Sequence, residues 1–212
     1  MSQSKWIVSR DRLCGLFEGV VAIDLTLLVL ELKPPKFDDK DVNHHDALWE
    51  HIHELSPELL AWLISFILIA RIWQEQHVVW SYSKDCDKLT IALTLGLMAT
   101  VSLIPFGSSL VGQYPEAHST VYIFSGIMVA NGIMSAALSR QLALSHHLHG
   151  GKGKIPLISR MSYHLTVFPA TAIFAVVLTQ IHHPLLGMAG WFAEPVAAFA
   201  FWQFRGQKDI IS

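Results

Sequence analysis

Six long apolar segments divide the chain, and shorter polar stretches separate them. A helix that crosses a lipid bilayer needs roughly 20 mostly apolar residues. The pattern therefore predicts six transmembrane helices, at about residues 13–32, 57–80, 89–106, 118–144, 157–181 and 184–204. These spans use most of the chain, so we expect one six-span unit over residues 1–212, an all-α membrane protein without a large soluble domain.

Prolines support several of these boundaries. Pro34 and Pro35 follow the first span and cannot continue a helix, whereas Pro57 suits the first turn of the second span. Pro105 should kink or close the third span near its end. Pro169 lies inside the fifth span, where neighbouring helices can satisfy the carbonyl group that proline leaves unbonded.

The basic residues predict how the spans are oriented. Cytoplasmic loops of membrane proteins carry an excess of Lys and Arg. If the N-terminus is cytoplasmic, only Lys33, Lys36 and Lys40 of the 15 Lys and Arg residues fall on the outer side. Both termini are therefore expected in the cytoplasm, and this arrangement requires an even number of spans.

The composition fits this class of protein. Charged residues make up 15% of the chain, against roughly 25% in an average soluble domain. The net charge of −2 leaves no basic surface for nucleic acid. Cys14 and Cys86 give neither a disulfide framework nor a zinc-ligand spacing. The outer segment 33–56 is acidic, and it is either a vestibule that concentrates cations or an ordinary solvated loop.

The first span holds more polar residues than a lipid anchor needs. Ionisable residues inside a bilayer usually face protein or water because burying them in lipid is costly. The residues in or beside this span are Arg12, Glu18, Asp24, Thr26 and Glu31. Arg12 and Glu18 are too far apart to pair directly, so we expect them to contact a neighbouring helix. The alternative for Arg12 is that its side chain simply reaches the interface.

His77 of the second span lies at the matching depth, and Trp73 is one helical turn before it. A polar network of these residues would fix the first span against the second and third. Ile23, Leu27 and Leu30 of the first span form an apolar stripe on one helical face, flanked by Thr26. Such a stripe is either an ordinary packing surface or, in a symmetric oligomer, the lining of a pore with a hydrophobic constriction. The spacing does not distinguish these two.

A resemblance to a known family bears on this choice. The first span reads Arg12-x-x-x-Leu16-Phe17-Glu18-Gly19 and continues to Thr26-Leu27-Leu28-Val29-Leu30-Glu31-Leu32. It resembles the signature of the transmembrane protein 175 family, Arg-x-x-x-Phe-Ser-Asp-Gly followed by an Ile-Thr-Leu-Leu-Val-Leu-Glu-Leu-like run. Trp73-x-x-x-His77, Leu103-Ile104-Pro105-Phe106 and Leu110-Val111-Gly112-Gln113-Tyr114 resemble further family motifs. The matches cover the first three spans.

The resemblance implies a prokaryotic potassium channel in the plasma membrane. Prokaryotic members of this family have six spans per subunit and assemble as homotetramers, with the first helix lining the pore. On that basis Ile23, Leu27 and Leu30 line the constriction and Thr26 is a candidate for ion coordination, while Arg12 and His77 hold the pore helix. Glu31 would stand at the mouth. No cofactor is expected, only permeant K⁺ and other monovalent cations in the pore.

Two features depart from the family pattern. Leu16-Phe17-Glu18 replaces Phe-Ser-Asp, which keeps an acid, lengthens it and loses a hydroxyl group. Asp24 stands where the family commonly has a small apolar residue. We expect Asp24 to bond to the second or third span or to the next subunit. Four buried carboxylates on the pore axis would repel one another, so we do not place it there.

Two other classes of function remain as alternatives. A secondary transporter or proton-coupled carrier would use broken helices near the midplane and internal repeats, and the sequence shows no repeat that divides it into similar halves. A membrane metalloenzyme would explain the 12 histidines, but their clusters are predicted on opposite sides of the membrane and do not form one metal site. No nucleophile–base motif is present, so an enzyme is not expected.

Overall fold

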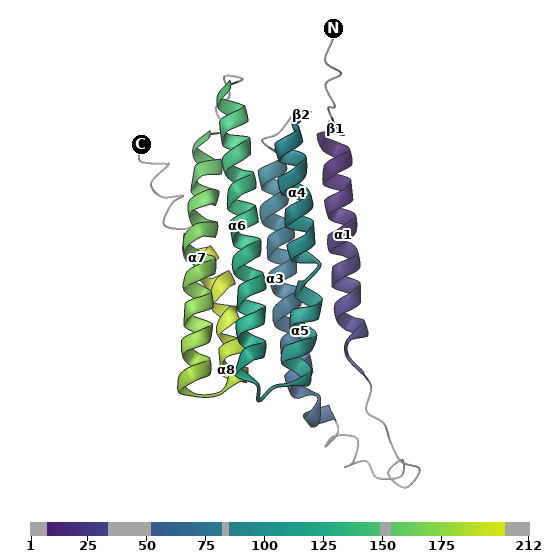
Figure 1. The fold of residues 1–212 in the computed structure, drawn as a ribbon, viewed down its shortest axis with the longest axis vertical. Helices are drawn as coiled ribbons and strands as arrows, with labels where there is room; N and C mark the ends of the chain where they lie inside the picture. Colours follow the sequence, from purple (N-terminus) through teal and green to yellow (C-terminus); the bar gives the residue numbers. More distant parts are fainter. Residues whose placement is uncertain (1–7, 34–51, 82–84, 149–153, 202–212) are drawn as a thin grey trace.

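The computed structural model describes residues 8–33, 52–81, 85–148 and 154–201 as an up-and-down bundle of long helices (Figure 1). In chain order the long helices are α1 (Arg10–Leu30), α3 (Ser56–Ser81), α4 (Lys88–Val101), α5 (Ile104–Gln113), α6 (His118–Leu148) and α7 (Lys154–Ile181). The short α8 (Pro184–Ala189) and the 3-10 turn η1 (Gly190–Phe192) follow, and residues 193–201 are again helical.

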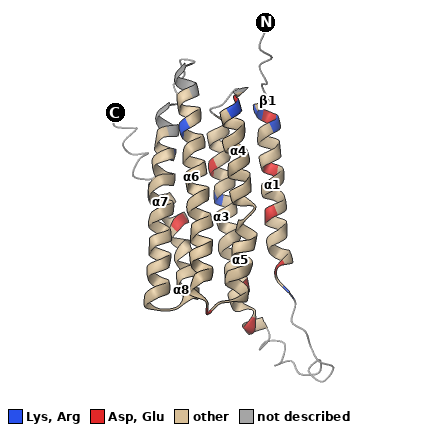
Figure 2. Cartoon of the chain, in the orientation of Figure 1, with Lys and Arg blue, Asp and Glu red and all other residues tan. Residues whose placement is uncertain are grey.

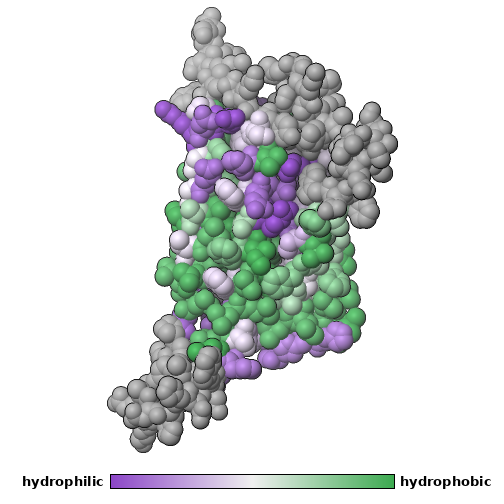
Figure 3. All heavy atoms as spheres, turned by 180° about the vertical axis from the view of Figure 1, so that it is seen from behind, coloured by the Kyte–Doolittle hydropathy of each residue, from purple (hydrophilic) through white to green (hydrophobic). Residues whose placement is uncertain are grey.

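These helices supply six candidate membrane spans in the described part of the chain, long and apolar enough to cross a bilayer. They run over Arg10–Leu30, Ser56–Ser81, Lys88–Gln113, His118–Leu144, Ile158–Ile181 and Pro184–Phe201. In the view from behind, hydrophobic residues form a broad belt and hydrophilic residues gather at the two ends (Figure 3). The protein is therefore a multi-pass integral membrane protein, as the apolar segments predicted.

The third span is two helices that meet at a break. α4 ends at Val101, and the N–H of Ser102 bonds to the carbonyl groups of Met98 and Thr100. α5 begins at Ile104 with Pro105 in its first turn, where the missing N–H of proline leaves no helical bond unmade. The disturbance predicted at Pro105 is thus a break in the helix just before this residue. The span does not close there but continues to Gln113, beyond the predicted end at residue 106.

The sixth span is also interrupted, which the sequence analysis did not predict. α8 has only six residues before it tightens into η1. Gly187 and Gly190 bring this segment against α7: a methyl group on Gly190 would lie 3.3 Å from the Cα atom of Ala175. The close approach of the two backbones explains why small residues stand at both positions.

A small strand pair lies at the start of α1 and corrects the all-α expectation in detail. Strand β1 (Val8–Ser9) pairs antiparallel with β2 (Asp85–Cys86), with Val8 opposite Cys86 and Ser9 opposite Asp85. Backbone pairing of two residues leaves no alternating hydrophobic pattern long enough to read. The pair joins the beginning of α1 to the segment that leads into α4.

The first helix lies at one edge of the bundle, with α7 at the other (Figure 1). Its main neighbours are α3, α4 and α5. The hydrophobic core continues from this contact through α4 and α6 to α7 and α8. Its largest fully buried side chains include Phe17, Ile64, Leu68, Leu97, Phe124, Tyr163 and Trp191. An edge position leaves one side of α1 uncovered within a single subunit.

Candidate functional site on α1

The two faces of α1 differ sharply. One face packs into the subunit through Leu13, Phe17, Val21, Asp24 and Leu28, each less than a twentieth exposed. The predicted stripe lies elsewhere on the helix: Ile23 is 59% exposed, Leu27 42% and Leu30 72%. The stripe is therefore not part of the core of the subunit. The stripe therefore does not pack within this chain, and its role in lining a pore stays a prediction.

Asp24 holds the middle of α1 to the break in the third span. Its side chain is 2% exposed, and its Oδ2 atom accepts a hydrogen bond from the Ser102 hydroxyl at 3.4 Å. Successive helical residues point about 100° apart. Anchoring Asp24 therefore turns the neighbouring Ile23 side chain to the uncovered side of α1. Asp24 was expected to bond to the second span, the third span or the next subunit. Among the described residues, it bonds to the third span.

The end of α4 is held from its other side by α6. Asn131 is fully buried, and its amide group donates a hydrogen bond to the Thr100 hydroxyl at 3.2 Å. Thr100 donates in turn to the carbonyl group of Leu97 at 2.8 Å. The break between α4 and α5 is thus fixed between a carboxylate of α1 and an amide of α6.

Near the beginning of α1, the predicted polar network is present in part. The Nδ1 atom of His77 lies 3.9 Å from the Oε1 atom of Glu18, and the Cys14 thiol donates to the same oxygen atom at 3.7 Å. The rings of Trp73 and His77 lie 5.7 Å apart. Glu18 and His77 are 45% and 64% exposed, so this ion pair alone contributes little stability.

Arg12 is not brought into that network. It is exposed, and no residue in the described ranges gives it a hydrogen bond or an ion pair. The nearby Arg10 instead pairs with Asp11 at 2.9 Å. The contact between α1 and α3 that the sequence assigned to Arg12 and His77 is therefore made by Glu18 and His77 in the single subunit.

Thr26 lies on the exposed side of α1, between Ile23 and Leu27. Its hydroxyl group donates to the carbonyl oxygen of Ile23 at 2.7 Å. A hydroxyl oxygen that donates its proton in this way keeps both lone pairs for other partners. Thr26 can therefore still coordinate a cation from the uncovered side of α1.

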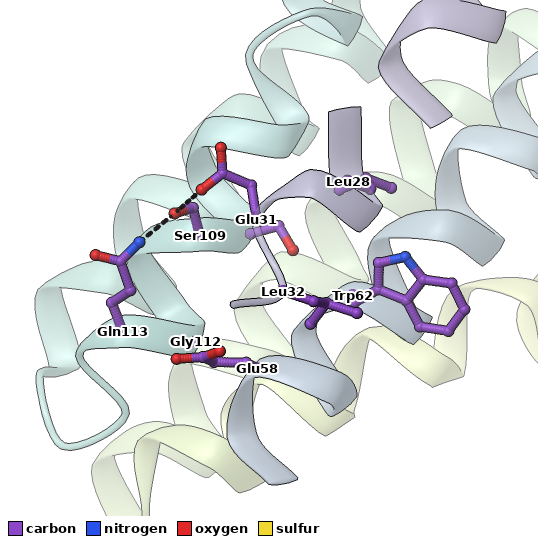
Figure 4. Close-up of a pocket in the computed structure, with 9 residues that line it drawn as sticks. Leu28, Glu31, Leu32, Glu58, Trp62, Ser109, Gly112 and Gln113 are labelled. Carbon is purple, nitrogen blue, oxygen red and sulfur yellow. Dashed lines mark hydrogen bonds between the residues drawn. The ribbon is translucent and has the colours of Figure 1, made fainter. Parts of the chain in front are cut away.

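At the far end of α1, Glu31 belongs to a chain of polar contacts. The Ser109 hydroxyl donates to Glu31 and the Gln113 amide donates to Ser109, both at 2.7 Å (Figure 4). This chain borders a small pocket between α1, α3 and α5, lined by Leu28, Glu31, Leu32, Glu58, Trp62, Ser108, Ser109, Gly112 and Gln113. A methyl group on Gly112 would lie 3.0 Å from the Cα atom of Glu58, so glycine permits this close contact.

The sequence analysis missed the serine partners of both acids. Asp24 bonds to Ser102 and Glu31 bonds to Ser109, and each pair is 78 residues apart. A constant separation means that α1 and the third span run in the same direction and in one register. A signal was present: the two acids and the two serines share a spacing of seven residues, about two helical turns.

These features define a class of protein. The chain is a six-span α-helical membrane protein whose first helix is anchored on one face by buried polar contacts and presents an apolar stripe on the other. The sequence model of the family described as "Endosomal/lysosomal potassium channel TMEM175" matches residues 12–105. This range covers α1, α3, α4 and the break that follows α4.

Several known proteins are similar to this chain over most of its length. A protein of Streptomyces collinus named as a potassium channel is 28% identical, across 81% of this chain and 86% of its own. The crystal structure of a lysosomal potassium-selective channel TMEM175 homolog from Chamaesiphon minutus matches with a TM-score of 0.68 and 26% identity. It covers 91% of this chain and 97% of its own. A Gallus gallus protein named endosomal/lysosomal proton channel TMEM175 is 25% identical, across 83% of this chain and 39% of its own.

Over residues 12–105 the chain matches the TMEM175 family model, and over most of its length it is similar to proteins named as potassium channels.

Proposed function

We propose that the chain is one subunit of a potassium-permeable cation channel in a prokaryotic plasma membrane. Four copies assemble around an axis lined by α1. The observation that carries the proposal is the orientation of α1, in which Asp24 is buried while Ile23, Leu27 and Leu30 are uncovered. The Streptomyces and Chamaesiphon relatives, named as potassium channels, support the choice of ion.

Lipid is a poor partner for the uncovered side of α1. Besides the apolar stripe, this side carries Thr26, and Gly15 and Gly19 have open space around them. Glu18, which borders this side next to α3, is 45% exposed. An ionisable residue in a span faces protein or water rather than hydrocarbon. Small residues allow another helix to approach closely. A neighbouring subunit and a water-filled axis together satisfy all of these residues.

The path of an ion follows from the order of residues along α1. Cations concentrate at the outer mouth beside Glu31, which the chain through Ser109 holds in place. They pass Leu30, Leu27 and Ile23 in turn, where the apolar side chains form a narrow neck. Partial loss of the hydration shell there favours K⁺ over Na⁺, because K⁺ holds its water less tightly. A neck of this kind binds ions weakly and gives modest selectivity.

The distribution of charge supports cytoplasmic termini. Most described Lys and Arg residues gather at the end of the bundle where α1 begins (Figure 2). They include Arg10, Arg12, Lys88 and Arg140. Such an excess marks the cytoplasmic side of a membrane protein. On this orientation Glu31 and the Ser109 contact face the outside.

The test is ion flux through the purified full chain in liposomes. A K⁺ gradient should drive a passive flux that a channel carries as large unitary currents. Ile23→Asn should change the unitary conductance and the K⁺/Na⁺ permeability ratio. Ile173→Asn is the matched control, since Ile173 is 65% exposed on α7, away from the proposed pore. If Ile23→Asn leaves both quantities unchanged, α1 is not the pore wall.

The same measurement decides between the channel and its rivals. Saturating transport of K⁺ against its gradient, driven by a second ion, would indicate a secondary transporter. The name of the Gallus gallus relative gives a specific reason to record H⁺ currents as well. A proton current without a K⁺ current would replace potassium as the permeant ion and leave the assignment of α1 to the pore intact.

A further inference from the structure

A second group of charged side chains lies inside the bundle, away from α1. In Figure 2, charged residues occur part-way along the helices as well as at their ends. Glu75 of α3 is 6% exposed and receives two arginines. Arg71 of the same helix bonds to its Oε1 atom at 3.2 Å, and Arg160 of α7 forms a close ion pair with its Oε2 atom. This ion pair joins α3 to α7 directly.

The group extends to the last helix of the bundle. Glu194, in the helical segment 193–201, is 1% exposed and accepts a hydrogen bond from the fully buried Tyr163 hydroxyl of α7. Arg71 lies close enough to both groups to interact with them electrostatically. We name Arg71, Glu75, Arg160, Tyr163 and Glu194 the buried ion cluster. Its two arginines, two glutamates and one tyrosine connect three helices.

Thermodynamic stability is a weak explanation for the buried ion cluster. The desolvation of buried charges offsets most of their attraction, and well-packed apolar residues are often as stable or more so. What charged contacts provide instead is geometry, because each ion pair accepts only a narrow range of positions. The buried ion cluster fixes α3 against α7 and the helix 193–201.

The opposite side of the same turns of α3 holds the pore helix. Trp73 lies two residues from both Arg71 and Glu75, and His77 lies two residues beyond Glu75. Side chains two residues apart on a helix point about 200° apart. His77 therefore faces away from the buried ion cluster and lies 3.9 Å from Glu18 of α1. One short segment of α3, residues 71–77, is held on one side by the ion pairs and contacts α1 on the other.

We propose that Glu75 and Arg160 are positioning residues for the pore, acting on α1 through α3. The proposal rests on the proposed function for its effect on conduction, but not for its effect on the position of α1. When the ion pair is lost, α3 is free to shift, and Glu18 and His77 separate. The tilt of α1 and the width of the neck at Ile23 then change together.

The first test measures the position of α1 directly. Cys14 and Cys86, both free thiols, are replaced by serine. Glu18→Cys and His77→Cys are then introduced, and the two thiols are cross-linked in liposomes with a short bifunctional thiol reagent. Arg160→Met should change the cross-linking rate by about 2- to 30-fold, the range found when residues coupling distant sites are substituted. Arg160→Lys should restore most of the original rate.

The matched control breaks a buried contact that does not touch α3. Ser125 of α6 accepts a hydrogen bond from the indole N–H of Trp191 at 3.3 Å. Ser125→Ala should lower the thermal unfolding temperature and leave the cross-linking rate unchanged. Comparing Arg160→Met with this variant separates a loss of general stability from a displacement of α1. Glu75→Gln, which removes the charge that both arginines share, provides a second substitution if Arg160→Met does not fold.

The second test records unitary currents and the K⁺/Na⁺ permeability ratio of Arg160→Met and Glu75→Gln without the introduced cysteines. We expect one or both quantities to change, with no change in Ser125→Ala. Unchanged cross-linking, or changed cross-linking with normal currents, would overturn the proposal. If the unsubstituted protein carries no K⁺ current while cross-linking still responds to Arg160→Met, the positioning of α1 stands and the channel function fails.

Discussion

The Ser102 hydroxyl, at the break in the third span, donates a hydrogen bond to the Asp24 carboxylate in the middle of α1, 78 residues earlier in the chain. Asp24 is buried and the next residue back, Ile23, is largely exposed. The contact therefore sets the rotation of α1 about its own axis. It places an acidic residue beside the proposed neck without exposing its charge to the permeating ion.

Removal of the Ser102 hydroxyl tests this contact. Ser102→Ala should destabilise the protein by about 1–3 kcal/mol, because the buried Asp24 carboxyl loses its donor. Ser109→Ala, which breaks the more exposed bond to Glu31, should cost only about 0.5–1.5 kcal/mol. Thermal unfolding of the purified variants gives both values. Equal destabilisation by the two substitutions would show that the Ser102–Asp24 bond stabilises the fold no more than the exposed Ser109–Glu31 bond does.

The beginning of α4 gives a prediction about pH. The Asp87 carboxylate caps α4 by accepting from the Thr90 N–H at 2.8 Å and from the Gln141 amide at 2.9 Å. Partial burial would raise the pKa of Asp87, but the bonds from Thr90 and Gln141 outweigh it and hold the pKa below its usual value. The stabilisation is therefore fully present above the unfolded-state pKa, roughly 4, and is lost as the pH falls through the lower folded-state pKa.

Asp87→Ala tests the contribution of this cap. The substitution removes the capping carboxylate and should destabilise the protein by about 0.5–2 kcal/mol at neutral pH. Asp87→Asn retains an oxygen acceptor and should lose less. As the pH falls through the lowered folded-state pKa of Asp87 and its carboxyl becomes protonated, the difference in stability between the unsubstituted protein and Asp87→Ala should shrink. Thermal unfolding across this pH range is the measurement. A difference that grows on acidification would contradict the assigned sign.

The sixth span packs closely against α7, which predicts that a larger side chain at position 187 is not tolerated. A methyl group on Gly187 would overlap the Thr179 hydroxyl and crowd the carbonyl oxygen of Ala175. Gly187→Ala should therefore destabilise the protein by about 1–3 kcal/mol, the usual effect of overfilling a packed site. Gly126→Ala on α6 is the control, because nothing lies within 4 Å of the added carbon there. A harmless Gly187→Ala would show that α8 and α7 are less tightly packed.

Hydropathy predicted the six spans because length and apolar content alone define a helix that crosses a bilayer. It did not predict the interruption at Gly190 or the pairing of Val8 with Cys86, which depend on how distant segments meet. In the third span, Pro105 correctly predicted that the helix is disturbed. It did not predict that the disturbance is a break that lets the Ser102 hydroxyl donate to Asp24, because this contact depends on two helices packing side by side.

The buried ion cluster was not predicted from the sequence. Arg71 and Arg160 entered the sequence analysis only as inner-side charges, although Arg71 lies ten residues before the end of α3, about 15 Å inside the helix. Only the ionisable residues of the first span were predicted to be buried. The same reasoning applied to Glu75 and Glu194 indicates buried sites. Their partners on α7 could not be chosen from spacing, since they come from separate helices.

If α1 lines the pore, Ile23 faces water, and the accessibility of a cysteine at this position tests that orientation. In protein with Cys14 and Cys86 replaced by serine, Ile23→Cys and Ile173→Cys provide two thiols at side chains of similar exposure, 59% and 65%. A water-soluble, positively charged thiol reagent should react with Ile23→Cys and block the K⁺ current. It should leave Ile173→Cys unmodified, because this position faces lipid in the proposed tetramer. An Ile23→Cys thiol that stays unreactive while K⁺ current flows would contradict the assignment of α1 to the pore.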